Sequence, residues 1–263
     1  STLNWLPHVT PQRQEWTEIF IFAFDHRSQL YELARQAGAP EKRLPALKRL
    51  LVETVARTET RLGLQSSVGA LIDDYYGEDA LHQATGRGWF LGRPVERPDA
   101  NPVIFELGRS IGVVLGHWPK EQVVKGVLSY HPDSPSDCRL AQESRIRTLY
   151  DATNETGHDF LLELIPPDSA AVYGDIVLRT MTRFYNLGIY PDWWTLPPRS
   201  AGEWSEIDAL IEARDPYCRG VVMLGMNAPF EQLESSFREA ANSRACRGFA
   251  VGRTIFQDPA RAW

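Results

Sequence analysis

The chain has 263 residues, 43% of them apolar and 24% charged, which is the composition of a globular protein. A net charge of -6 argues against general binding to nucleic acids or anionic membranes, because both require a dominant basic surface. No apolar stretch approaches the length of a membrane span, and the first residues lack a signal-peptide pattern. These features leave a small molecule as the expected partner.

The N-terminal segment, residues 1–18, contains prolines and tryptophans but no clear periodicity, so we predict a linker or an extension there. From residue 19 to residue 263, short apolar runs alternate with longer amphipathic segments. The predicted strands are 19–25, 68–73, 88–91, 123–130, 160–165, 193–196, 221–224 and 248–252, and a weak ninth run at 103–107 is set aside. The predicted helices are 28–37, 44–62, 140–156, 175–186, 205–213 and 229–242.

This alternation of strands and helices predicts an α/β fold, a single-domain (β/α)8 TIM barrel over residues 19–263. A doubly wound open sheet is the alternative, but no GxGxxG loop follows the first strand. Because the chain ends soon after the last predicted strand, we leave open whether part of the last helix is missing.

The cysteines of the chain, Cys138, Cys218 and Cys246, are widely spaced, odd in number and without a CxxC pair. This pattern fits reduced thiols and predicts a cytoplasmic protein. It shows no zinc spacing, and we expect no metal and no cofactor.

Among the four lysines, Lys125 alone lies inside an apolar run, residues 123–130, whereas Lys42, Lys48 and Lys120 have charged or polar neighbours. Burial disfavours an ammonium group and lowers its pKa, which prepares a lysine for Schiff-base chemistry. The alternative is a lysine that reaches solvent or pairs with a structural carboxylate.

Charged residues follow the predicted strands at their carboxyl ends, where the active sites of barrels form. Of the adjacent Asp73 and Asp74, only one can face the site, because neighbouring strand residues point to opposite faces; we expect it to be Asp73. The same alternation places Lys125 and Glu163 in one cavity. An amine and an acid are the minimum for Schiff-base carbon–carbon chemistry, and a structural ion pair is the simpler alternative.

A phosphate site is predicted at the ends of the last two strands. Gly225 and Asn227 follow the first of them, before Pro229 opens a helix whose N-terminus faces the site. Gly252 and Arg253 follow the second strand. Together they offer backbone amides and a cation for a phosphate group.

Several motifs resemble the aldolase-type domain that is fused behind the sugar kinase of bacterial myo-inositol catabolism. The resemblance covers about residues 6–263 and extends, at longer range, to class I tagatose-1,6-bisphosphate aldolases, which are TIM barrels. It implies retro-aldol cleavage of 2-deoxy-5-keto-gluconate 6-phosphate to dihydroxyacetone phosphate and malonate semialdehyde. The motifs are FAFDHRSQL at 22–30, LIDDYYG at 71–77, VVK at 123–125, YHPD at 130–133, LLELIPP at 161–167, PDWW at 191–194 and GFAVGRTIF at 248–256.

The resemblance also implies roles for individual residues. Lys125 takes a supporting position that faces the substrate, and Glu163 is the acid/base that transfers protons. Asp25 and Arg27 contact the substrate's hydroxyl groups, and Gly252 and Arg253 bind its phosphate. We count Asp25 among the catalytic residues, together with Lys125 and Glu163.

One position departs from the family pattern. In the relatives, PDWW is followed by the Schiff-base lysine and then Leu-Glu-Pro, whereas this chain continues with Thr195-Leu196-Pro197-Pro198. Threonine cannot form an iminium, so we predict Thr195 as a substrate-binding residue only.

Three hypotheses follow from this departure. In the first, Lys125 replaces the missing lysine as nucleophile. In the second, the chain binds a phosphorylated keto-sugar without cleaving it, as a sensor or as a partner of a fused or associated sugar kinase. The sequence is also compatible with an oligomer. In the third, a metal held by Asp25, Asp73, Asp74 and Glu163 polarises the carbonyl group.

Overall fold

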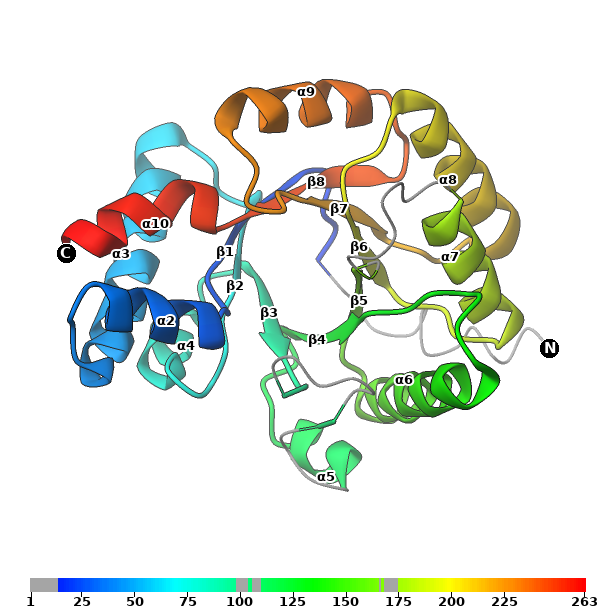
Figure 1. The fold of residues 1–263 in the computed structure, drawn as a ribbon, viewed down its shortest axis with the longest axis horizontal. Helices are drawn as coiled ribbons and strands as arrows, with labels where there is room; N and C mark the ends of the chain where they lie inside the picture. Colours follow the sequence, from blue (N-terminus) through cyan, green and yellow to red (C-terminus); the bar gives the residue numbers. More distant parts are fainter. Residues whose placement is uncertain (1–13, 98–103, 106–109, 166, 168–174) are drawn as a thin grey trace.

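A computed structural model describes residues 14–97, 104–105, 110–165, 167 and 175–263 of the chain. Its eight parallel strands close into a barrel in the order β1 to β8, and helices surround that barrel (Figure 1). The chain is therefore a single-domain (β/α)8 barrel, as predicted. The strands are β1 (Ile19–Ala23), β2 (Val68–Leu71), β3 (Phe90–Pro94), β4 (Gln122–Leu128), β5 (Phe160–Leu164), β6 (Trp193–Leu196), β7 (Gly220–Leu224) and β8 (Cys246–Val251).

The outer helices include all six that were predicted, together with α4, α5 and α10. Capping residues define several of their ends: Gly63 adopts the left-handed conformation after α3, and Ser200 forms a capping box with Glu203 at the start of α8. The helices are α2 (Ser28–Gln36), the 3-10 helix η2 (Glu41–Arg43), α3 (Leu44–Leu62), α4 (Glu78–Ala84), α5 (Ile111–Leu115), α6 (Ser136–Thr156), α7 (Ile176–Asn186), α8 (Ala201–Arg214), α9 (Phe230–Ala240) and α10 (Arg253–Ala262).

The last helix is present after β8, where the sequence left its completeness open. Helix α10 has ten residues and packs beside α2 (Figure 1). The guanidinium of Arg43 lies 4.2 Å from the ring centroid of Trp263 and anchors the end of this segment.

The side chains of each strand alternate between the barrel interior and the surrounding helices. Trp193 belongs to the interior cluster and meets Phe90 edge to face, with ring centroids 5.2 Å apart. Its neighbour Trp194 points outward and donates a hydrogen bond from Nε1 to the Tyr185 hydroxyl at 3.0 Å. Large apolar side chains therefore fill the barrel interior around Trp193 and Phe90, and an open cavity can form only toward the carboxyl ends of the strands.

Two predicted segments lie partly outside the described residues. Residues 1–13 of the predicted linker lie outside the described residues. Trp16, which is described, packs against Phe90 with ring centroids 5.8 Å apart. The division at residue 18 stays a prediction. Within the weak run at 103–107, Phe105 forms an isolated antiparallel bridge with Glu96 and adds no strand to the barrel.

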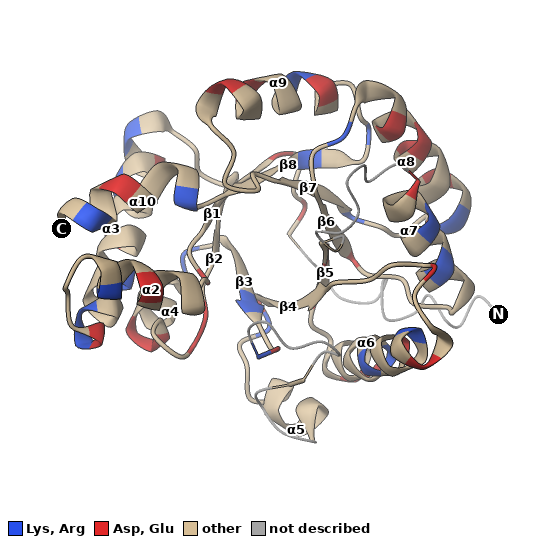
Figure 2. Ribbon diagram, in the orientation of Figure 1, with Lys and Arg blue, Asp and Glu red and all other residues tan. Residues whose placement is uncertain are grey.

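Basic and acidic residues are mixed over the outer helices (Figure 2). In the part of the chain that the structure describes, none of the helices combines the length and apolarity that a membrane span requires.

Closure of the barrel between β1 and β8 requires glycine at position 248. Gly248 has a φ of 154°, and a Cβ atom there would lie 1.8 Å from the carbonyl oxygen of Ile19, its partner in β1. Backbone cannot move aside as a flexible side chain can, so the two strands approach closely only with glycine.

We expect Gly248→Ala to lower the free energy of unfolding by about 3 kcal/mol, because the substitution forces β1 and β8 apart. Urea denaturation followed by circular dichroism measures this loss. Gly202→Ala is the matched control, since nothing lies within 4 Å of a Cβ at that helical position. A Gly248→Ala protein as stable as the control would contradict this account of closure.

Candidate functional site

A cavity of about 680 Å³ opens at the carboxyl ends of the strands, where barrel enzymes carry their active sites. Of the ten residues predicted for the site, eight line this cavity, and Asp73 and Thr195 do not. The eight are Asp25, Arg27, Lys125, Glu163, Gly225, Asn227, Gly252 and Arg253.

Lys125 lies between two carboxylates at the base of the cavity. Its Nζ is 2.6 Å from Oδ2 of Asp25 and 3.1 Å from Oε2 of Glu163. The alternation along β4 and β5 aims Lys125 and Glu163 inward, and Asp25 reaches them from the end of β1. All three side chains are at least nine-tenths buried, so their charges interact with little screening by water.

These contacts decide the protonation of Lys125. Burial disfavours its ammonium form, but Asp25, Glu163 and Glu96 outweigh this effect and raise the pKa of Lys125 above its ordinary value. Burial acts in the expected direction, but the expectation of a lowered pKa for Lys125 is wrong because the neighbouring carboxyl groups outweigh burial. Burial also acts against ionisation of Asp25, but Lys125 and His26 lower the pKa of Asp25 to about 2.

Glu163 behaves differently from Asp25. Burial, opposed by Lys125 and reinforced by Asp25, raises the pKa of Glu163. The site thus contains an ammonium, a firmly ionised carboxylate and a carboxyl group that takes up a proton more readily. That combination is suited to moving protons.

Glu96 is a further acidic group in the cavity that the sequence analysis missed. It follows β3 and is only 8% exposed. The backbone carbonyl of Glu96 accepts a hydrogen bond of 2.6 Å from Nη2 of Arg27. The alternation of side chains along β3 could have identified Glu96 in the sequence. It places Phe90 in the barrel interior, and every second residue from there, through Pro94 to Glu96, faces the same side.

The opposite wall, after β7 and β8, is built of backbone and one cation. Met226 and Asn227 have φ values of 51° and 58°, so the chain turns sharply after β7. The Thr254 hydroxyl donates to the carbonyl of Ala228 at 2.9 Å and joins this turn to the start of α10. The first backbone amides of α10 and the Arg253 guanidinium together can bind an anion.

Gly252 allows this wall to approach β1. A Cβ at this position would lie 2.1 Å from the carbonyl oxygen of Ala23. Burial lowers the pKa of the adjacent Arg253, whose guanidinium is partly withdrawn from water.

Asp73 was predicted to bind substrate, but the structure buries it beneath the cavity with Lys48. Both side chains are fully buried and form an ion pair. Nζ of Lys48 also donates to the backbone carbonyls of Phe24 at 2.8 Å and His26 at 3.1 Å. The chain leaves β2 at Leu71 and turns this carboxylate toward α3, so the prediction that Asp73 binds substrate gains no support from this arrangement.

Lys48 thus fixes the main chain on either side of Asp25, a function that the sequence analysis missed. Its polar neighbours in sequence were misleading, because helical neighbours lie three and four positions apart. Leu44, Lys48, Val52 and Val55 form one buried stripe of α3. This periodicity was the signal that could have identified Lys48.

Thr195 is fully buried beside Glu163, its register partner in β5. Its hydroxyl has no hydrogen-bond partner among the described residues. The side chain does not line the cavity, so the prediction that Thr195 contacts substrate gains no support from this arrangement.

The carboxylates named in the metal hypothesis do not converge. Asp73 pairs with Lys48, and Oδ2 of Asp74 lies 2.9 Å from Arg93. Within the ranges that the structure describes, no group of three His, Cys, Asp or Glu side chains is arranged to hold a metal ion.

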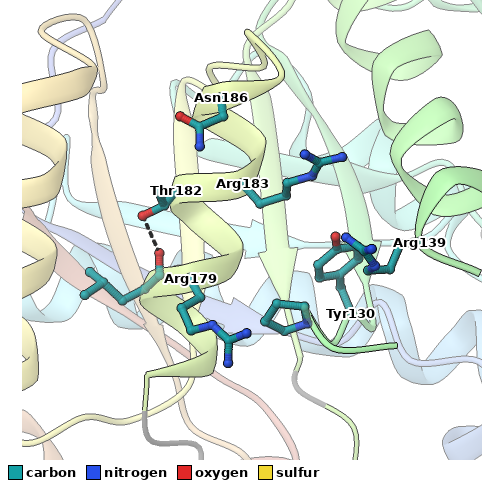
Figure 3. Close-up of a pocket in the computed structure, with 8 residues that line it drawn as sticks. Tyr130, Arg139, Arg179, Thr182, Arg183 and Asn186 are labelled. Carbon is teal, nitrogen blue, oxygen red and sulfur yellow. Dashed lines mark hydrogen bonds between the residues drawn. The ribbon is translucent and has the colours of Figure 1, made fainter. Parts of the chain in front are cut away.

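A second hollow of about 300 Å³ lies on the outside of the barrel, where arginines from α6 and α7 surround Tyr130 (Figure 3). These arginines already have partners. Arg179 pairs with Asp133, and Arg183 donates to Glu143 at 2.9 and 3.0 Å. The barrel cavity, which combines acids and bases with open volume, is therefore the candidate active site.

A closed parallel barrel with a polar cavity at the carboxyl ends of its strands places the chain among the (β/α)8-barrel proteins. Over residues 1–263 it matches the family described as "Uncharacterized protein conserved in bacteria" (DUF2090), and it belongs to that family. None of the curated proteins compared with the chain matches it.

The solved structures with a similar fold include the following two. Cgl0159 from Corynebacterium glutamicum (Brevibacterium flavum) is 15% identical with a TM-score of 0.59, over 99% of this chain and 90% of that one. A fructose-bisphosphate aldolase from Slackia heliotrinireducens is 11% identical with a TM-score of 0.58, over 98% of this chain and 81% of that one. At these identities the likeness concerns the fold.

We expect Lys48→Met to destabilise the protein by about 3–5 kcal/mol, because it leaves the Asp73 carboxylate buried without its cation. Urea denaturation measures the loss. The double variant Lys48→Met/Asp73→Asn should recover part of it, since an amide replaces the unpaired charge, and the exposed Lys42→Met is the control. Equal stability of Lys48→Met and Lys42→Met would refute the role of this pair.

Proposed function

We propose that this chain binds a phosphorylated keto-sugar in the barrel cavity and cleaves one of its carbon–carbon bonds by a retro-aldol reaction. The observation that carries the proposal is the position of Lys125, in contact with Asp25 and Glu163 and open to a cavity whose other wall suits an anion. The aldolase among the proteins of similar fold is consistent with this reaction class.

In the proposed binding mode, the phosphate lies at the ends of β7 and β8, against the first amides of α10 and the Arg253 guanidinium. Asp25 and Arg27 face the sugar hydroxyl groups. The keto carbonyl then lies at Lys125.

In the proposed reaction, Lys125 transfers a proton to Glu163 and its amine adds to the keto carbonyl, and water leaves to give an iminium. A carboxylate next takes the proton of the β-hydroxyl group. The bond between the α and β carbons breaks, and its electron pair moves to the iminium, which yields an aldehyde and an enamine. Protonation of the enamine carbon and hydrolysis release the second product and the free amine.

The resemblance in sequence suggests 2-deoxy-5-keto-gluconate 6-phosphate as substrate, dihydroxyacetone phosphate and malonate semialdehyde as products, and a sugar kinase as a fused or associated partner. We propose a cytoplasmic location as well, because Cys138, Cys218 and Cys246 are unpaired thiols.

A second candidate function is phosphosugar binding without cleavage. It is favoured by Thr195, which stands where the relatives have their Schiff-base lysine, and by the carboxylates that keep Lys125 protonated. The two candidates share a binding mode and differ in whether Lys125 ever becomes a nucleophile.

Borohydride trapping separates the two candidates. Incubation with the phosphorylated keto-sugar and sodium borohydride should add the reduced substrate to Lys125, as peptide mass spectrometry would show. Lys125→Met should lose the adduct and Lys120→Met should keep it. Turnover without an adduct would contradict the lysine mechanism, and so would loss of activity in EDTA. Binding of the substrate with neither adduct nor turnover would support the second candidate.

The phosphate site has a separate test. Arg253→Ala should weaken binding of dihydroxyacetone phosphate by about 10-fold or more, because a charge-assisted hydrogen bond to phosphate is lost. Isothermal titration calorimetry measures this affinity, and Arg238→Ala on the exposed face of α9 is the matched control. An equal effect on unphosphorylated dihydroxyacetone would show that Arg253 does not recognise the phosphate.

A further inference from the structure

The cavity contains a carboxyl group that neither the family motifs nor the proposed reaction uses. Glu96 extends from the end of β3 into the cavity, and its side chain is more than nine-tenths buried. Its Oε2 atom is buried and has no hydrogen-bond partner among the described residues. Burial in this position costs more free energy for a carboxylate than for a protonated carboxyl group.

The surroundings of Glu96 favour the protonated form. Among the described residues, the charged groups that face it are Lys125 from β4, Asp25 and Arg27 from the end of β1, and Glu163 from β5. Lys125 already contacts Asp25 and Glu163, and Arg27 donates to the backbone of Glu96. Lys125 thus pairs directly with two carboxyl groups but not with that of Glu96, so burial favours the protonated form of Glu96.

A retro-aldol reaction needs two proton transfers at different atoms. The β-hydroxyl proton must leave before the bond breaks, and a proton must then reach the carbon that carries the electron pair. A single carboxyl group that accepts the first proton must be repositioned to deliver it. Two carboxyl groups on different strands can act at the two atoms without such movement.

We propose that Glu96 is a second acid–base residue of this site: its carboxyl group delivers a proton to the enamine carbon, while Glu163 accepts the proton of the β-hydroxyl group. Proton balance is restored when Glu163 releases its proton to solvent and Glu96 takes one up. The inference rests on the proposed function. Burial, reinforced by Asp25 and Glu163 against the effect of Lys125, raises the pKa of Glu96 to about 7, where both forms are accessible at neutral pH.

The expected result for Glu96→Gln is a kcat lower by about 100-fold with little change in KM, because the amide keeps the shape and loses the proton. The wild-type rate should fall as pH rises above about 7, where Glu96 ionises, and Glu96→Gln should lose this pH dependence. Glu96→Asp retains a carboxyl group and should recover part of the rate. Glu143→Gln changes an equally buried carboxyl group outside the cavity and should leave kcat unchanged.

A separate measurement does not depend on turnover. Infrared spectroscopy at pH 6 should show a protonated carboxyl band that Glu96→Gln lacks and Glu143→Gln retains. Wild-type turnover together with an unchanged kcat and pH profile in Glu96→Gln would overturn the role of Glu96 and leave the proposed function intact. Absence of turnover in the wild-type protein would contradict the proposed function instead, and absence of the band would by itself overturn the assignment of the proton to Glu96.

Discussion

The ion pair between Lys125 and Asp25 joins residues 100 positions apart in the sequence and is the contact on which the site depends. Each charge is buried and would be costly alone. Together, and with Glu163, they are stable only where the ends of β1, β4 and β5 meet. The site and the closed barrel therefore require each other: closure brings the charges together, and their pairing makes a polar centre tolerable inside an apolar wall.

Much of this fold could be predicted from the sequence. All eight strands overlap the predicted apolar runs, and α3 has the bounds that its pattern predicts, since Gly63 ends it. The convergence of Lys125 and Glu163 followed from the alternation of strand residues, which barrel geometry makes reliable. The contacts with phosphate and substrate stay predictions. What sequence and geometry provide is the placement of these residues around one cavity.

The features that the sequence did not reveal are those that depend on loops and on long side chains. Asp73 follows β2 and turns away from the cavity, which strand alternation cannot anticipate once the strand has ended. Lys48 reaches from a helix to the end of β1, and its role appears only when α3 is placed against the barrel. The charge balance of Lys125 likewise depends on acidic residues from β5 and from the ends of β1 and β3, and the apolar run around Lys125 in the sequence predicted the wrong direction for its pKa.

The seam between β1 and β8 has a consequence for how the site is completed. Gly248 and Gly252 fit closely against Ile19 and Ala23, so the first strand of the barrel pairs with the last. Asp25 and the anion-binding turn at Arg253 face one cavity only after that pairing. Without β8 the chain keeps Asp25, Glu96, Lys125 and Glu163 but lacks Gly252 and Arg253, so the cavity is complete only in the closed barrel.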